Sequence, residues 1–396
     1  MKKIEIKNLT KIFGKNTKEG LKRLKKGQTK EEIFKETGMT VGVNQVDLDI
    51  NEGELFVIMG LSGSGKSTLI RMLNRLIEPT SGDILIDGVH ITNLNKAELR
   101  DVRRQKIAMV FQSFALFPHM TIAENTAYGL EVQGIPEEDR LRKAKEALEL
   151  VNLAGYEDQY PSQLSGGMQQ RVGLARALAA DTDIILMDEA FSALDPLIRK
   201  EMQDELEKLQ AKMGKTIVFI THDLNEALKL GDHIALMRDG KIVQVGTPEE
   251  ILMNPANTFV ERFVEDVDVS KILSAENIMI QPETIDVRRH GPRVALERMK
   301  QAGISSIYVV NEKNELQGIV TADEAAQGIK DHVIDIRSIM ETDVPRVDED
   351  CPLTEIIEKI YDIKVPIAVT DQKVLKGIII RGTVLAALSK EEVSYA

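Results

Sequence analysis

Residues 60–67 read Gly60-Leu61-Ser62-Gly63-Ser64-Gly65-Lys66-Ser67, a complete G-x-x-x-x-G-K-[ST] phosphate loop. An apolar run, 55–59, precedes the loop and a helix-forming run, 68–73, follows it, so the sequence predicts strand, glycine loop and helix. Backbone N–H groups in such a loop turn toward phosphate oxygens, and the helix dipole adds to the attraction. Lys66 is expected to reach the β- and γ-phosphates, and the Ser67 hydroxyl to ligate Mg²⁺. We therefore predict that this loop, together with Thr68, binds a nucleoside triphosphate.

Length and composition narrow the class of protein. A chain of 396 residues exceeds one ordinary domain, and 43% hydrophobic content is enough for real cores. The net charge of −12 argues against a general nucleic-acid binder, so no nucleic-acid partner is expected. The single cysteine, Cys351, excludes an internal disulfide framework and indicates a reducing cytoplasm. No signal-peptide pattern opens the chain and no apolar run approaches the ~18–20 residues of a membrane span, so any membrane role is expected to come through a partner or by surface contact.

The chain divides by pattern into a larger and a smaller part. Apolar strands alternate with helical patterns over 1–264, which predicts an α/β domain. A lysine-rich, helix-friendly insert, 15–38, interrupts this domain. We interpret the insert either as a docking element or sensor of anionic lipid, or as a solvated amphipathic helix that covers the domain edge. Residues 265–275 are predicted to be a linker.

A second nucleotide-handling pattern ends in two carboxylates. Residues 184–189 read Ile-Ile-Leu-Met-Asp-Glu, which is typical of a buried parallel strand with its acids at the carboxyl end, where such sheets bind ligands. Asp188 is suited to hold Mg²⁺ through water. Glu189 is placed to polarise an attacking water as a general base.

A second anion-binding pattern follows the middle of the domain, where residues 164–171 read Leu-Ser-Gly-Gly-Met-Gln-Gln-Arg. Ser165 is predicted to cap a helix whose first turn exposes backbone N–H groups at two glycines. One triphosphate does not need two anion-binding helix starts from the same chain. We therefore predict a head-to-tail dimer in which this loop covers the γ-phosphate held by the partner's phosphate loop. The residues assigned to this contact are Ser165, Gly166, Gly167, Met168 and Gln169. An ordinary capped helix start is the alternative.

These motifs occur in one order together with Gln112, the run 192–195 (Ser-Ala-Leu-Asp) and the run 220–223 (Ile-Thr-His-Asp). In this order, residues 1–265 resemble the nucleotide-binding subunit of an ABC transporter. The resemblance implies a P-loop α/β fold with a RecA-like core and a helical subdomain, and ATP hydrolysis coupled to transport. Because no membrane spans are present, it also implies a separate integral-membrane permease.

The resemblance also implies roles for single residues. Gln112 would contact Mg²⁺ and couple to the permease, and His222 would contact the γ-phosphate and orient the attack. With Glu189 these two form the implied catalytic set. Asp195 would cross the dimer, and Phe13 would stack on adenine.

Two further stretches, 112–121 and 188–199, are similar to the ATPases of glycine betaine/proline (quaternary amine) osmoprotectant importers, as are residues 59–62 and the basic insert. This similarity implies uptake of glycine betaine or a related quaternary amine. It also implies an extracellular substrate-binding protein or domain and a place at the cytoplasmic face of the cell membrane. The alternatives are an importer of another solute (proline, choline or carnitine), a non-transport ABC ATPase, and a purely regulatory nucleotide-binding module.

The C-terminal part repeats itself at a period near 60 residues. The runs 306–311 and 316–321 match 366–371 and 375–380, and a predicted amphipathic helix precedes each pair, at 294–301 and 353–361. Residues 276–332 and 333–392 together resemble a tandem CBS module, a smaller α+β unit that commonly binds adenine nucleotides between its halves.

The likeness to nucleotide-binding CBS modules is incomplete. Where the motif usually has a ribose-binding Asp, this chain has Glu324 and Thr383, so ordinary AMP or ATP binding is not expected. A dimer-interface ligand, with cyclic di-AMP the first candidate, and a purely structural dimerisation module both remain open. The candidate regulatory contacts are Val365, Pro366, Ile367, Arg381 and Thr383, with Arg381 suited to pair with a phosphate.

Overall fold

The computed structural model describes residues 1–192, 194–265, 267–361, 363 and 365–389. The chain divides into two compact units, Met1–Glu265 and Asp266–Ala396. Among the described residues, no helix is long and apolar enough to cross a membrane.

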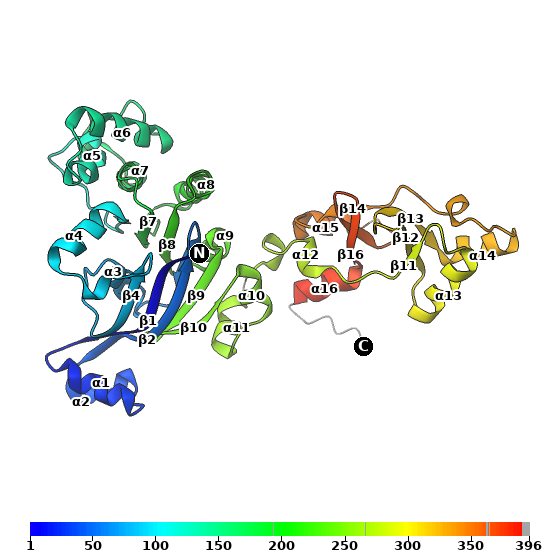
Figure 1. Ribbon diagram of the computed structural model, residues 1–396, viewed down its shortest axis with the longest axis horizontal. Helices are drawn as coiled ribbons and strands as arrows, with labels where there is room; N and C mark the ends of the chain where they lie inside the picture. The colour runs from blue at the N-terminus through cyan, green and yellow to red at the C-terminus, as the bar shows by residue number, and fades with distance from the viewer. Residues whose placement is uncertain (193, 266, 362, 364, 390–396) are drawn as a thin grey trace. The chain divides into compact units, whose positions relative to one another are not determined.

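Two sheets form the first unit (Figure 1). The smaller sheet is antiparallel and has the order β2-β1-β4-β5, with β1 Lys2–Phe13, β2 Thr40–Asn51, β4 Ser81–Ile86 and β5 Val89–His90. The larger sheet has the order β10-β9-β3-β8-β7-β6, with β3 Leu55–Met59, β6 Ile107–Val110, β7 Ile184–Asp188, β8 Thr216–Thr221, β9 His233–Arg238 and β10 Lys241–Gly246. Its strands run parallel except for β10, which pairs antiparallel with β9.

Helices separate the strands, as the alternating pattern predicts. Those of the first unit are α1 Thr17–Lys25, α2 Lys30–Thr37, α3 Lys66–Leu73, α4 Lys96–Gln105, α5 Ile122–Val132, α6 Glu137–Leu150, α7 Gly166–Ala179, α8 Pro196–Met213, α9 Leu224–Leu230, α10 Pro248–Met253 and α11 Thr258–Val264. Helices α5, α6 and α7 pack on one another; α5 and α6 lie apart from the sheets, whereas α7 also contacts β6 (Figure 1). The P-loop α/β core with a helical subdomain is therefore confirmed.

The larger sheet places three loops at one edge. All five residues of β3 are buried because β8 and β9 flank it and helices cover the sheet, which explains its unbroken apolar run. In register, Met59 of β3 pairs with Thr221 of β8, and Asp188 of β7 pairs with Ile220. Because these strands are parallel, the loops that follow their carboxyl ends meet at the same edge.

The lysine-rich insert forms α1 and α2. A capping box of Thr29 and Glu32 begins α2, and Gly38 ends it in the left-handed conformation, at φ 67°. Ile33 packs with apolar residues of β1 and β2. The insert therefore covers the edge of the smaller sheet, while Lys22, Lys25 and Lys26 lie in solvent.

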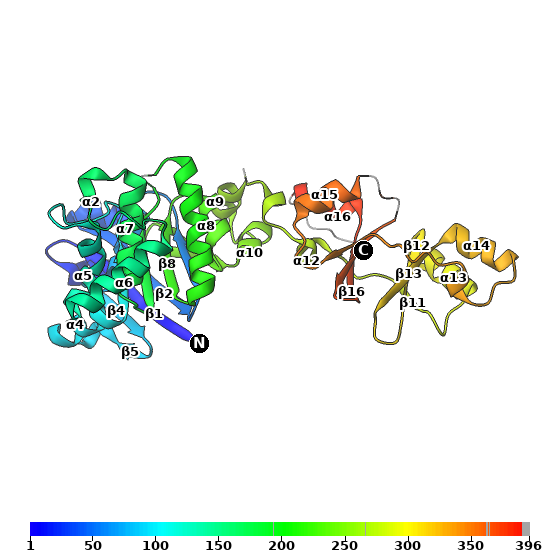
Figure 2. The ribbon, with the colours of Figure 1, turned by 90° about the horizontal axis from the view of Figure 1, so that it is seen from above.

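Two copies of one topology form the second unit. In the first, β11 (Thr284–Asp286) pairs parallel with β12 (Ser306–Val310), which pairs antiparallel with β13 (Leu316–Thr321). In the second, β14 (Arg346–Asp348), β15 (Ile367–Asp371) and β16 (Val374–Ile379) repeat this arrangement. The helices are α12 Ala275–Ile278, α13 Pro292–Ala302, α14 Ala322–Lys330, α15 Leu353–Ile360 and α16 Arg381–Ser389. Figure 2 shows α13 and α14 beside the first sheet and α15 and α16 beside the second.

The two repeats pack against each other. The hydroxyl of buried Tyr308, in β12, donates to the carbonyl of Pro366 at 2.6 Å, and burial raises the pKa of this phenol. Single bridges join Ile280 to Ile378 and Glu315 to Val374. The apolar residues of each half therefore complete the core of the other, as expected for an internal duplication.

An ion-pair cluster links the two sheets of the first unit. Lys3 of β1 is almost fully buried and lies 2.8 Å from Asp87, which follows β4, and 3.0 Å from Asp183, which precedes β7. Lys106, before β6, reaches the same carboxylates at 2.9 and 3.1 Å. Partial burial acts to raise the pKa of both aspartates, but the hydrogen bonds from the lysines outweigh it and hold both pKa values below the usual range.

We expect Lys3→Met to lower the free energy of unfolding of the first unit by about 1–2 kcal/mol at pH 7, measured by urea denaturation. The cost stays below that of a fully buried pair because Asp183 is partly exposed and Lys106 remains. The depressed carboxyl pKa values contribute stability above the unfolded-state pKa, near 3.9, and this contribution disappears as pH falls through the folded-state values. The difference between variant and wild type should therefore shrink below about pH 4. Lys2→Met, which changes an exposed neighbour paired with Asp49, is the control, and an equal loss in both variants would contradict the assignment.

Candidate nucleotide-binding and catalytic site

Two glycines fix the shape of the phosphate loop. Gly60 and Gly65 have φ of 153° and 108°, and a Cβ added to them would lie 2.1 Å from the carbonyl oxygen of Met237 and 2.2 Å from that of Gly42. Neither the backbone conformation nor the space admits a side chain. The loop therefore packs closely against β2 and the end of β9, and backbone atoms form its inner face.

The loop presents unused donors. Within the described residues, the backbone N–H groups of Gly63, Gly65, Lys66 and Ser67 donate to no acceptor. The hydroxyl of Ser64 is buried and also has no partner there. Leu61, Ser62 and Gly63 are exposed, and Ser67 and Thr68 are half-buried at the start of α3. Unpaired N–H groups at a helix N-terminus fit an anion of phosphate type, so the residues present suit a triphosphate.

Lys66 is held at the mouth of the loop. Its ammonium is buried and donates to the carbonyls of Gly60 at 2.7 Å and Leu61 at 3.2 Å. Burial lowers the pKa of Lys66, and the carboxylates of Glu189 and Asp188 act in the opposite direction. A partly desolvated cation bound only to carbonyls can exchange them for phosphate oxygens.

Three distant segments converge on Glu189. Its Oε2 accepts a long hydrogen bond from Gln112 Nε2 at 3.4 Å and lies 3.7 Å from His222 Nδ1. Gln112 also donates to the Ser192 hydroxyl at 3.2 Å, and that hydroxyl donates to the carbonyl of Glu189 at 2.9 Å. Glu189 has φ 47°, an uncommon conformation outside glycine that recurs at functional sites. The structure therefore brings together all three residues of the implied catalytic set.

Asp188 is buried at the end of β7 and is already paired. Arg71 of α3 reaches its Oδ2 at 3.0 and 3.1 Å. Sequence reasoning missed Arg71, because nothing in the pattern of α3 distinguishes it from a surface arginine. No group of three or more acidic, His or Cys residues suited to a metal occurs in the described part of the chain. Mg²⁺ does not require one, since it binds one or two protein groups together with phosphate oxygens and water.

The Leu-Ser-Gly-Gly motif begins α7. Ser165 caps the helix by accepting from the N–H of Met168 at 3.3 Å, as predicted. Gly166 is exposed, whereas a Cβ on Gly167 would lie 2.7 Å from Ile198. The Gln169 amide donates to the carbonyls of Pro161 and Leu164.

Within one chain, this motif and the phosphate loop are separate. No hydrogen bond or ion pair joins the described residues of 164–169 to those of 60–68. Asp195, which is exposed, caps α8 by accepting from the N–H of Ile198 at 3.1 Å; its neighbour Ala193 lies outside the described residues. Ser165 and Asp195 thus both act as helix caps within their own segments. The solvent-facing groups of these segments are free to contact a ligand or a second chain.

Arg176 anchors the loop that follows Gln112. From α7 its guanidinium donates to the carbonyls of Phe114 at 3.0 Å and Ala115 at 2.7 Å, and burial lowers its pKa. Phe114 and Ala115 both have positive φ, at 59° and 49°. Sequence reasoning missed this contact, which ties the Gln112 loop to the helix that carries the Leu-Ser-Gly-Gly motif.

Phe13 ends β1 and lies beside the phosphate-loop helix. A Cβ on Gly42 would meet the Phe13 ring at 2.9 Å and the Thr68 methyl at 3.4 Å, so the three residues are neighbours. The ring is 40% exposed, and the Lys11 ammonium lies 5.0 Å from its centroid. The insert that follows Phe13 therefore does not move it away from the site.

Most of the candidate regulatory residues of the second unit are buried or hydrogen-bonded within the unit itself. Arg381 donates to the carbonyls of Tyr361 and Ile363, and the buried Thr383 hydroxyl donates to Ile380 at 2.8 Å. Val365 and Pro366 are half-buried and Ile367 is buried. Glu324, where a ribose-binding Asp was expected, caps α14 in a box with Thr321. The guanidinium of Arg381 is thus already hydrogen-bonded through one of its nitrogens in the described residues.

Known protein families match both parts of this chain. The ABC transporter family matches residues 43–192, and the CBS domain family matches residues 275–331 and 336–390. The glycine betaine/carnitine transport ATP-binding protein GbuA of Listeria monocytogenes is 59% identical over 100% of this chain and 99% of its own. OpuAA of Bacillus subtilis, a glycine betaine transport ATP-binding protein, is 60% identical over 98% and 92%.

Among solved structures, the dimeric post-hydrolysis state of the ATP-binding cassette MJ0796, bound to ADP and Pi, matches with a TM-score of 0.53 and 35% identity. The match covers 62% of this chain and 98% of that one.

A further sequence relative is the Escherichia coli glycine betaine/proline betaine transport system ATP-binding protein ProV, which is 52% identical over 99% of each chain. This chain therefore belongs to the family of ABC transporter ATP-binding subunits that includes these glycine betaine transport proteins, and it carries that family's ATPase domain followed by a pair of CBS domains.

Proposed function

We propose that this chain hydrolyses ATP to energise uptake of glycine betaine or a related quaternary amine through a separate permease. The observation that carries the proposal is the convergence of Gln112, Glu189 and His222 beside the donors of the phosphate loop. The relatives named for glycine betaine transport support the solute, and the family implies the permease.

Each residue has a role that follows from its position. The loop amides and Lys66 bind the triphosphate, with Lys66 neutralising the β/γ oxygens. Glu189 accepts a proton from the attacking water, and His222 orients the γ-phosphate. Ser67, Gln112 and Asp188 would hold Mg²⁺, which supplies charge neutralisation of the phosphates when bound. Phe13 offers its exposed ring face to the adenine.

Glu189→Gln should leave ATP binding intact and lower turnover at least ~10²-fold, because the amide keeps the shape of the carboxylate and cannot take a proton. The measurement is steady-state phosphate release by the assembled transporter, with ATP binding measured in parallel. Lys66→Ala serves as the contrasting variant and should weaken ATP binding itself. Near-normal hydrolysis by the Glu189→Gln transporter would eliminate Glu189 as the base.

The permease contact is assigned to a groove beside the Gln112 loop. The groove has a volume of about 310 Å³ and lies between α4 and β6 on one side and α5 and α7 on the other. Arg100 and Tyr128 line it together with Arg176, whose guanidinium also holds the loop after Gln112. A permease segment in this groove would therefore contact the residue that anchors the catalytic glutamine loop. We propose that this contact holds the chain at the cytoplasmic face of the membrane and that an extracellular substrate-binding protein or domain completes the importer.

The insert is proposed to contact anionic lipid. Lys22 and Lys25 of α1 and Lys26, which follows it, are exposed, and Phe34 of α2 is 58% exposed. Two contacts connect the insert to the phosphate loop. Lys30 of the insert pairs with Asp239, and the next residue, Gly240, donates its N–H to the carbonyl of Ser64 in the phosphate loop at 2.9 Å. The hydrogen bond from Lys30 holds the pKa of Asp239 below its usual range.

Lys22→Glu combined with Lys26→Glu should reduce binding of the chain to phosphatidylglycerol vesicles at least about thirtyfold at low salt, because each of the two basic residues near an anionic surface contributes about 1 kcal/mol. The measurement is co-sedimentation at two ionic strengths. Glu31→Lys in the wild-type chain changes the charge of the insert by +2, in the opposite direction, and should not weaken binding. Equal vesicle binding by the lysine variant and the wild type would remove the insert as the lipid contact.

The CBS pair is proposed to regulate transport by binding cyclic di-AMP between two copies. Two observations support this proposal: the duplicated α+β unit, and the candidate contact residues at the strand ends around Ile367 and Arg381. Because Arg381 and Thr383 are bonded internally in one copy, the ligand would have to meet a surface completed by the second copy. A ligand shifts the ATPase only if it prefers one arrangement of the paired modules.

Removing residues 276–396 should abolish inhibition by cyclic di-AMP while ATP hydrolysis persists, because the ATPase site lies within the first unit. Reconstituted transport with and without the nucleotide is the measurement. Inhibition that survives the truncation would place the regulatory site elsewhere. Salt activation that survives it would assign ionic sensing to the first unit or the permease.

A further inference from the structure

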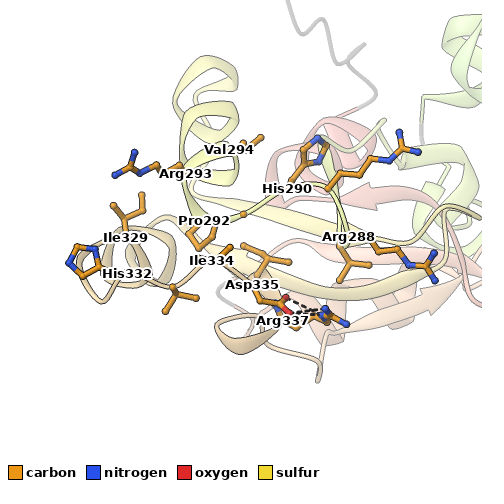
Figure 3. Close-up of a pocket in the computed structure, with 15 residues that line it drawn as sticks. Arg288, His290, Pro292, Arg293, Val294, Ile329, His332, Ile334, Asp335 and Arg337 are labelled. Carbon is orange, nitrogen blue, oxygen red and sulfur yellow. Dashed lines mark hydrogen bonds and ion pairs between the residues drawn. The ribbon is translucent and has the colours of Figure 1, made fainter.

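The first CBS repeat contains a cavity that no part of the proposed function uses. Its volume is about 710 Å³, and it lies between the segment after β11 and the segment after α14 (Figure 3). The lining residues are 287–294, Ile329 and 332–337. A cavity of this size accepts a small organic ligand rather than a single ion.

The polar lining is strongly cationic. Four arginines and two histidines line the cavity together with a single carboxylate, Asp335: the basic residues are Arg288, Arg289, Arg293, Arg337, His290 and His332. Asp335 pairs with Arg337 at 2.7 Å, and Arg288 lies 3.5 Å from Glu312 outside the cavity. Within the described residues, Arg289 and Arg293 have no ion-pair partner. The cavity therefore carries an excess of positive charge.

The fold does not require this charge. The equivalent segment of the second repeat, 349–352 between β14 and α15, carries Glu349 and Asp350 and no basic residue. It contributes Asp350 to a cavity whose lining is mixed in charge, with Asp348 and Glu355 beside Arg346 and Lys359. Two segments with the same place in the same topology thus have opposite charge. Positive charge in the first repeat is a property of that site and not of the CBS fold.

Backbone and ring donors add to the arginines. Helix α13 begins at the cavity after Gly291, and no side chain caps it, so the N–H groups of Arg293 and Val294 donate to nothing in the described residues. His290 accepts the N–H of Asp286 at Nδ1, which leaves Nε2 as the protonated, donating nitrogen of its neutral ring. All of these groups suit an anion with several oxygen acceptors.

Apolar residues fill the space between the charged groups. Arg288 and Arg293 lie on either side of Pro292 in Figure 3, with Ile334 close by. Pro292 is buried, whereas Ile334 is 88% exposed. The lining therefore combines a basic rim with an uncovered apolar surface, as a ligand with phosphate groups on an organic body would need.

We propose that this cavity binds a multiply charged phosphate compound, held by Arg289, Arg293 and the N-terminus of α13. The phosphate groups come either from a soluble phosphorylated molecule or from a lipid headgroup. The site is distinct from the strand ends around Arg381 and from the ATPase site, so it stands independently of the function proposed for either.

The test uses the full chain with Lys66→Ala, which weakens phosphate binding at the ATPase site, and inorganic tripolyphosphate as the probe. Calorimetric titration should show binding that falls at least about tenfold on Arg289→Glu with Arg293→Glu, because two charge-assisted contacts are lost. The control is Lys313→Glu with Lys373→Glu, which makes the same charge change at exposed hairpin turns of the same unit and should leave affinity within about twofold. Arg289→Gln with Arg293→Gln, checked by circular dichroism, separates loss of the site from misfolding.

A second arm uses phosphatidylglycerol vesicles in place of tripolyphosphate. Weaker vesicle binding by the arginine variant than by the lysine control, with tripolyphosphate affinity unaffected, would identify a lipid headgroup as the source of the phosphate. Loss of tripolyphosphate binding would identify a soluble ligand. Equal behaviour of the folded arginine variants and the control in both arms would overturn the proposal.

Discussion

The parallel register of β3, β7 and β8 is the constraint on which the site depends. It sets the carboxyl ends of three strands at one edge, so that the phosphate loop, Glu189 and His222 follow from adjacent strands. The phosphate loop is in turn pressed onto the carbonyls of Gly42 and Met237 by glycines that have no room for a side chain.

Two of the segments predicted to contact ATP are nevertheless not bonded to the phosphate loop within one chain's described residues. The loop that begins α7 and the residue that begins α8 offer exposed groups at helix starts, yet neither is bonded to the phosphate loop of the same chain in the described residues. Arg176 joins α7, the helix that begins at Ser165, to the loop after Gln112 by two hydrogen bonds. In the function proposed above, this connection would couple closure of two chains and docking of a permease to the Gln112 loop.

Much of this arrangement could be predicted from the sequence, because its signals are local. The phosphate loop, the buried run ending at Asp188 and the cap at Ser165 each follow from residue types at fixed spacing. The pairing of Arg71 with Asp188 and the hold of Arg176 on the Gln112 loop could not be predicted, because they join residues about 60 or more positions apart and neither arginine stands in a distinctive pattern. In the CBS pair, Arg381 has the charge expected for phosphate binding, but the fold engages it with backbone carbonyls. The cationic cavity of the first repeat emerges only when two segments some forty residues apart are brought together.

The central claim is that two chains share each ATP site, and cross-linking tests it most directly. In a Cys351→Ser, Glu189→Gln background, one chain carries Ser62→Cys in the phosphate loop and a second carries Ser165→Cys at the start of α7; both serines are exposed. After mixing and mild oxidation, the account predicts a disulfide-linked pair of the two different chains that forms with ATP and not without it. Absence of that pair with ATP, in chains shown to bind ATP, would contradict the shared site.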